Sequence, residues 1–101
     1  MTNDWPEGWR AVDARNVPHA WELEVRLEIG PRHVLWQQHV RLIARRDDAD
    51  DALFELDDGR VAEVHLTWSQ KQEADKKYPW TVIFPSLAEW RTAKKGEQED
   101  S

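Results

Sequence analysis

The feature that most constrains the fold is a turn signal between two strand-like runs. The segment Asp57–Gly59 separates residues 52–56 from residues 60–68, and both runs alternate apolar with polar side chains. Alternating runs on either side of an Asp-Gly pair are typical of a β-hairpin. We therefore predict two antiparallel strands here.

The length of the hairpin loop decides which residues pair. A two-residue turn at Asp58-Gly59 would place Phe54 opposite Glu63, whereas a three-residue loop with Gly59 in the left-handed conformation shifts the pairing by one residue. The longer loop gathers the apolar side chains of both strands on one face, namely Ala52, Phe54, Leu56, Ala62, Val64, Leu66 and Trp68. Because a one-residue slip would turn this whole set over, burial favours the three-residue loop.

Residues 18–29 fit two patterns. Apolar side chains recur every four residues from Trp21 to Ile29, which is typical of a helix, yet the segment also alternates apolar residues with Glu and Arg, which is typical of a strand. A proline at its start suits a first helical turn, and Gly30-Pro31 suits a helix stop. The end signals favour a helix, and the strand alternative stays open.

Residues 40–46 have the alternation of a strand, and the run 80–84, ended by Pro85, predicts a further strand. Ser86 with Glu89 three residues later forms a capping-box pattern that predicts a C-terminal helix. The short connections imply an antiparallel meander. The predicted fold is α+β, with a four-stranded antiparallel sheet, an N-terminal and a C-terminal helix in the order αββββα, and one or both helices covering the Phe54 face.

The domain organisation follows from where polar residues gather. Residues 1–16 are polar apart from a few large side chains, which predicts an irregular N-terminal arm, and residues 94–101 are almost wholly polar, which predicts a frayed tail. Residues 17–93 then form a single α+β domain.

The composition excludes several classes of protein. The 101 residues carry a net charge of -6 and include no cysteine. Nucleic acids and anionic membranes attract an excess of Lys and Arg, so neither is an expected partner. No thiol nucleophile or disulfide is possible, and the longest apolar runs are far shorter than the ~20 residues that a membrane helix needs. We expect a cytoplasmic protein.

The hairpin also carries a resemblance. The run 50–59, DDALFELDDG, followed by Val64 to Ser69, VHLTWS, is similar to a recurrent signature of small bacterial proteins to which no activity is assigned. Gly30 and His33 before the hairpin, and Glu73 and Pro79 after it, also resemble that pattern, although Pro31 to His33 departs from its expected helix exit. The resemblance implies a natural single domain and nothing about mechanism.

His65 is the leading candidate for chemistry. In the three-residue-loop register it lies on the second face of the hairpin with Glu63 and Thr67, and a histidine beside a carboxylate can act as a general base. With Glu73 from the following loop, these residues would form the site of a small enzyme or ligand-binding domain. The simpler alternative is that His65 makes one hydrogen bond on a solvated strand.

Other chemistries find no support in the sequence. The four histidines lack metal-ligand spacing, and the acidic run 47–51 fails the EF-hand pattern because Ala52 and Asp58 stand where glycine and glutamate are needed. Solvated acids facing Arg45 and Arg46 are the expected case. The isolated glycines form no phosphate-binding loop. We predict no metal and no cofactor.

Seven tryptophans are the compositional outlier. Trp21, Trp68, Trp80 and Trp90 fall on predicted core faces, whereas Trp5, Trp9 and Trp36 lie in irregular or junction segments. Exposed tryptophans are typical of protein-interaction hot spots. The leading hypothesis is a non-catalytic interaction module, such as an adaptor, inhibitor or immunity-type protein, binding a protein partner or itself through Trp5, Trp9, Trp36, His65 and Thr67.

Overall fold

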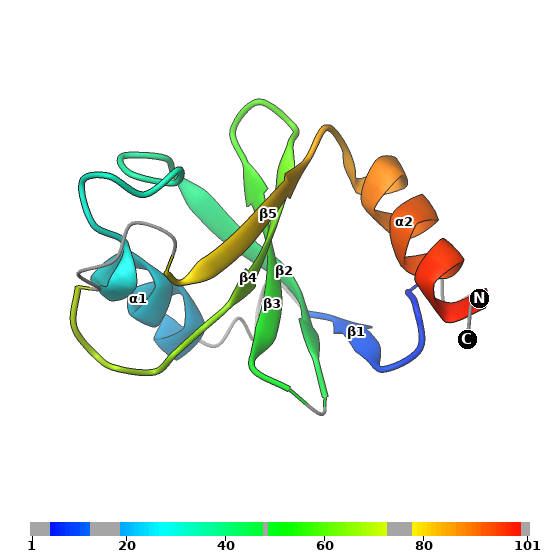
Figure 1. The fold of residues 1–101 in the computed structure, drawn as a ribbon, viewed down its shortest axis with the longest axis horizontal. Helices are drawn as coiled ribbons and strands as arrows, with labels where there is room; N and C mark the ends of the chain where they lie inside the picture. Colours follow the sequence, from blue (N-terminus) through cyan, green and yellow to red (C-terminus); the bar gives the residue numbers. More distant parts are fainter. Residues whose placement is uncertain (1–4, 13–18, 48, 73–77, 100–101) are drawn as a thin grey trace.

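The described part of the chain forms one five-stranded antiparallel sheet with a helix on each face (Figure 1). This computed structural model describes residues 5–12, 19–47, 49–72 and 78–99. The elements are β1 (Trp9–Ala11), α1 (His19–Glu28), β2 (Val40–Arg46), β3 (Asp51–Leu56), β4 (Val61–His65), β5 (Trp80–Phe84) and α2 (Leu87–Glu99). The strands lie in chain order across the sheet. The predicted α+β class, antiparallel meander and two helices are confirmed.

The hairpin between β3 and β4 has the predicted register. Phe54 pairs with Ala62, and the Leu56 N–H donates to the Arg60 carbonyl at 2.9 Å, which closes a three-residue loop. Gly59 has a φ of +93°, a conformation that side-chain-bearing residues rarely adopt. The two-residue alternative, with Phe54 opposite Glu63, is therefore excluded.

The ambiguous segment 18–29 is a helix, α1, from His19 to Glu28. Its stripe at i, i+4 spacing packs inward, with Val25 and Ile29 buried. Leu23 and Leu27, which a strand would have placed on the same face as Val25, are instead exposed. The helical period separates these two sets because successive residues turn by 100° rather than 180°.

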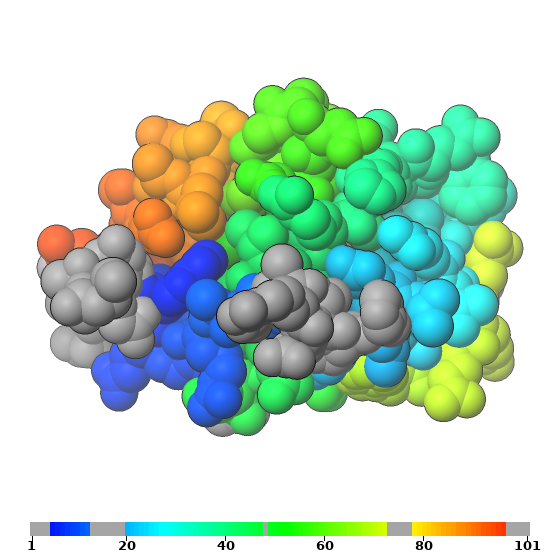
Figure 2. Space-filling view, turned by 180° about the vertical axis from the view of Figure 1, so that it is seen from behind, coloured from blue at the N-terminus to red at the C-terminus, as the bar shows by residue number. Residues whose placement is uncertain are grey.

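The N-terminal segment departs from the prediction because it contains β1. Trp9 pairs with Arg46 and Ala11 with Ala44, so the sheet has five strands and the element order is βαββββα. A strand of three residues is too short to show a period-two pattern, which is why the sequence indicated an irregular arm. Figure 2 shows the segment 5–12, in blue, lying against α2, in orange.

Each face of the sheet carries a buried cluster, and a different helix packs on each cluster. α1 and the chain after it cover the predicted core face, in a cluster formed by Val25, Ile29, Leu35, Val40, Leu42, Ala52, Phe54, Leu56, Ala62, Val64 and Leu66. α2 and β1 cover the opposite face, in a cluster formed by Trp9, Ala44, Leu53, Val61 and Trp90. The second face is thus a core as well, where the sequence indicated a mostly polar surface.

The C-terminal helix begins as predicted and continues further. The Ser86 hydroxyl accepts the N–H of Glu89 at 3.2 Å, which is an N-cap. The helix runs to Glu99, past the point where a frayed tail was expected, and Lys94 in its third turn is ion-paired with Glu63. None of the described helices combines the length and the apolar character that crossing a membrane requires.

The four tryptophans predicted to be in the core divide into three kinds. Trp90 is fully buried, while Trp21 and Trp68 are partly buried and stack edge to face with their ring centroids 5.1 Å apart. The prediction was wrong for Trp80, which is 55% exposed. Trp80 lies on β5, the last strand of the sheet.

Candidate functional site

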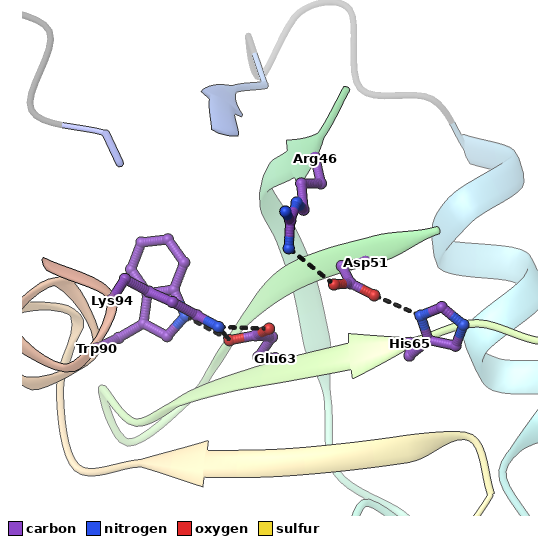
Figure 3. A network of polar contacts seen from close by, with 6 residues as sticks. All are labelled: Arg46, Asp51, Glu63, His65, Trp90 and Lys94. Atoms are coloured by element: carbon purple, nitrogen blue, oxygen red, sulfur yellow. Dashed lines mark hydrogen bonds and ion pairs between the residues drawn. The ribbon is translucent and has the colours of Figure 1, made fainter. Parts of the chain in front are cut away.

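A cross-strand pair joins His65 to Asp51 on the second face of the sheet. The register of β3 and β4 places these residues directly opposite each other, and the Nδ1 atom of His65 is hydrogen-bonded to an Asp51 oxygen (Figure 3). The other Asp51 oxygen lies 3.7 Å from the guanidinium of Arg46 on β2. Asp51 is mostly covered, whereas the His65 ring is half exposed and can reach a ligand.

A second polar cluster lies on the same face, at the next cross-strand pair of β3 and β4, which is Leu53 with Glu63. Glu63 on β4 accepts a hydrogen bond from the Trp90 indole Nε1 at 2.9 Å, and the Lys94 ammonium lies 2.8 Å from the same carboxylate (Figure 3). Both donors come from α2. Because the Glu63 and Lys94 side chains are largely covered, these contacts tie the helix to the sheet.

The two clusters form one wall of a groove of about 560 Å³. It is lined by Asp51, Glu63, His65, Tyr78, Trp80, Val82, Phe84 and Lys94. The cross-strand pairs alternate polar with apolar partners, since His65 faces Trp80 and Glu63 faces Val82. The volume lies within the ~300–1,000 Å³ of typical ligand sites. The groove therefore offers charged hydrogen-bonding groups on one side and an exposed aromatic surface on the other.

The apolar wall is unusually open to solvent. Trp80 is 55% exposed, Val82 42% and Tyr78 41%. These residues lie on β5 or just before it, and β5 is the last strand of the sheet. An apolar surface rimmed by polar groups is typical of an interaction site.

The site differs in detail from the predicted one. His65 and Glu63 do line the same groove, but the partner of His65 is Asp51, and Glu63 is engaged by α2. Thr67 does not line the groove, and its N–H donates to Glu28 at 3.0 Å on the side of α1. Glu73 lies outside the described residues.

The tryptophans proposed for binding do not gather on one surface. Trp9 is 5% exposed and packs edge to face on Trp90 with the ring centroids 5.0 Å apart. Trp5 is partly buried against the same ring, at 5.8 Å. Trp36 is 40% exposed and lines a separate hollow beside Arg26 at the end of α1. Trp5 and Trp9 thus belong to the second core cluster, whereas the sequence predicted a core only on the Phe54 face.

Sequence reasoning missed six of the eight residues that line the groove, and one of them had a usable signal. The hairpin register that pairs Ala52 with Val64 also implies that Asp51 faces His65. Lys94 was assigned to a frayed tail, and Trp80 was assigned to the core. Neither error had a local signal, because both depend on where α2 lies over the sheet.

Buried carboxylates of α1 hold the chain that leaves β4. Glu28 accepts the N–H groups of Thr67 at 3.0 Å and Trp68 at 2.7 Å, and Glu24 accepts that of Gln70 at 2.8 Å. Trp68 and Gln70 have φ values of 57° and 61°. Burial raises the pKa of Glu28 to about 7, and the hydrogen bond that its protonated carboxyl donates to Glu24 contributes to the rise. The Glu28 carboxyl accordingly holds its proton up to near-neutral pH.

The acidic turn makes ion pairs with basic residues from neighbouring strands. Asp47 lies 2.6 Å from Arg10 of β1, and Asp51 pairs with Arg46 as expected. The described residues contain no group of three or more His, Asp or Glu side chains that could hold a metal ion. Comparisons of the chain with protein-family models, with curated proteins and with solved structures find no match.

Proposed function

We propose that this chain is a non-catalytic protein-interaction module whose docking surface is the groove together with strand β5. The observation that carries the proposal is the exposed apolar stripe of Tyr78, Trp80 and Val82 beside a wall of charged groups. Interface hot spots are enriched in Trp and Tyr, and a polar surround excludes water from them. The composition and placement of the stripe match that pattern.

The polar wall supports binding rather than turnover. Glu63 is engaged by Trp90 and Lys94, and Asp51 is engaged by His65 and Arg46, so each carboxylate already has two partners in the fold. The described lining residues include no serine, threonine or cysteine to serve as a nucleophile. Because its carboxylates already have hydrogen-bond and ion-pair partners, this wall of the groove orients a ligand without rearranging its side chains.

Affinity capture with a tagged full-length chain tests the proposal. We expect a stoichiometric protein partner, including an untagged copy of the chain itself, whose recovery falls at least about tenfold with Trp80→Ala. Trp36→Ala is the matched control, since it removes an exposed tryptophan from a different surface. Recovery of no partner, or equal recovery with both variants, would overturn the proposal.

A second candidate is a small-ligand site centred on the His65–Asp51 pair, because that pair opens into a groove of ligand size. A ligand with a planar apolar group and a hydrogen-bonding group would stack on Trp80 and reach His65. NMR with a fragment library should then shift the Trp80 indole and His65 ring signals together, and His65→Ala should remove the response. Shifts confined to other residues, or no shifts at all, would exclude this candidate.

A further inference from the structure

The two edges of the sheet differ in how they are protected. β1 is three residues long and carries Arg10, which is ion-paired with Asp47 at 2.6 Å. Short length and charge are devices that keep an edge strand from pairing with another chain. β5 forms the opposite edge, has five residues, and contains no charged residue. Every other strand carries at least one, so β5 alone lacks this protection among the described strands.

The side chains of β5 are also those of a pairing strand. Trp80, Thr81, Val82, Ile83 and Phe84 are all aromatic or β-branched, which are the residue types that favour sheets. Prolines stand immediately before and after this run. Because proline cannot donate to a sheet ladder, it limits any added pairing to these five residues.

We propose that β5 pairs antiparallel with β5 of a second copy of the chain, about a two-fold axis at Val82. The proposal rests on the proposed function and names the partner of the same surface. It follows from the charge and length of β5, which are the same in both copies. Two copies of a chain of net charge -6 repel each other, and an uncharged edge adds no like charges directly opposite each other to that repulsion. An uncharged five-residue strand bounded by prolines fits an identical strand over its full length.

The pairing determines what meets across the axis. Val82 of one copy lies opposite Val82 of the other, and Trp80 of each lies opposite Phe84 of its partner. Directly opposed residues of antiparallel strands share a face, so the aromatic pairs lie on the groove side of a continuous ten-stranded sheet. The two grooves meet at this seam, and the exposed parts of Trp80 and Val82 become covered.

A cysteine at the axis gives a direct test, because the chain has no cysteine of its own. Opposed residues in an antiparallel ladder have Cα atoms about 4.5–5.5 Å apart. Disulfides span about 4.4–6.8 Å, so Val82→Cys should form a disulfide-linked dimer under mild oxidation. Leu23→Cys is the control, since it places a thiol at a position of α1 that is at least as exposed as Val82. We expect cross-linking at least about tenfold faster for Val82→Cys.

The second measurement is the dimer dissociation constant of the wild-type chain and of Val82→Lys, determined by sedimentation. The wild-type chain should show a concentration-dependent dimer, and Val82→Lys should raise the dimer dissociation constant at least about tenfold, because it sets two like charges opposite each other. Leu23→Lys should leave the constant unchanged. Circular dichroism of each variant confirms that the fold is retained.

A wild-type chain that stays monomeric at high micromolar concentration, with Val82→Cys cross-linking no faster than Leu23→Cys, would overturn the dimer. The proposed function as an interaction module would still hold after that result if Trp80-dependent capture of a different protein persisted. A dimer insensitive to Val82→Lys would place the self-contact elsewhere and would also overturn the proposal.

Discussion

His33 and Pro79 are separated by 46 residues in the chain, and the His33 Nε2 atom lies 2.9 Å from the Pro79 carbonyl oxygen. The other ring nitrogen, Nδ1, accepts the N–H of Leu35 at 2.9 Å, so the proton of the neutral ring lies on Nε2 and is donated to Pro79. The imidazole is buried. It therefore connects the chain after α1 to the start of β5, where the aromatic wall of the groove begins.

Replacing His33 by phenylalanine should destabilise the fold. The Leu35 N–H loses its buried acceptor, which costs about 1–3 kcal/mol, while the Pro79 carbonyl keeps the Thr81 hydroxyl. Urea denaturation of His33→Phe measures the loss. His39→Phe alters an exposed histidine and should change the free energy of unfolding by less than about 0.5 kcal/mol. Equal effects of the two variants would contradict the structural role of His33.

The contact between Glu63 and α2 predicts an energetic coupling. Lys94→Met leaves the partly buried carboxylate with Trp90 alone and should cost about 1–3 kcal/mol of unfolding free energy. The matched control is Lys95→Met, because Lys95 is the exposed neighbour of Lys94, and this variant should change the free energy of unfolding little. A double-mutant cycle with Glu63→Gln should show that the two changes are not additive. Additivity would mean that the ion pair contributes no stability.

The raised pKa of Glu28 predicts a pH dependence of stability. The folded protein holds this proton up to a pH of about 7, whereas the ordinary pKa is 4.5, so between these values the folded state binds more protons than the unfolded state. The free energy of unfolding should therefore fall as the pH rises through this window, through the contribution of Glu28. Denaturation of the wild type and of Glu28→Gln at several pH values isolates it, because the variant cannot titrate there. Glu89→Gln, which changes an exposed glutamate, should keep the wild-type slope; a wild-type slope in Glu28→Gln would refute the assignment.

The second core face predicts where truncation is costly. Leu53 is fully buried between β3 and α2, and Leu53→Ala should cost about 2–5 kcal/mol. Leu23 is 56% exposed on α1, so Leu23→Ala should change stability by less than about 0.5 kcal/mol. Thermal denaturation compares the two. A small effect at Leu53 would indicate that α2 does not cover this face.

The parts of the fold that the sequence predicted are those with local causes. The hairpin register followed from the demand that one face be apolar, the bounds of β2 followed from its alternation, and the end of β5 followed from Pro85. α1 followed from its end signals and its i, i+4 stripe. Each of these signals lies within one continuous stretch of the chain, where propensity and period act directly.

The parts that could not be predicted depend on contacts between distant segments. No pattern in residues 87–99 indicates that α2 packs on the face opposite to α1, where it helps to bury Leu53 and Val61. The same placement leaves Trp80 uncovered. Asp51 is different, because the predicted hairpin register already places it opposite His65, although the acidic run indicated a turn.

The attachment of α2 has a consequence for motion. The helix covers one end of the second face and is joined to β4 through Trp90 and Lys94, while the central strands are buried on both sides. Segments with few buried contacts open at a lower free energy than the core, so we expect amide hydrogens of α2 to exchange with solvent before those of β3. Whenever α2 lifts, the groove loses the wall that contains Lys94. The width of the groove therefore fluctuates. A ligand that bridges Lys94 and Trp80 would slow the exchange of the amide hydrogens of the whole helix α2.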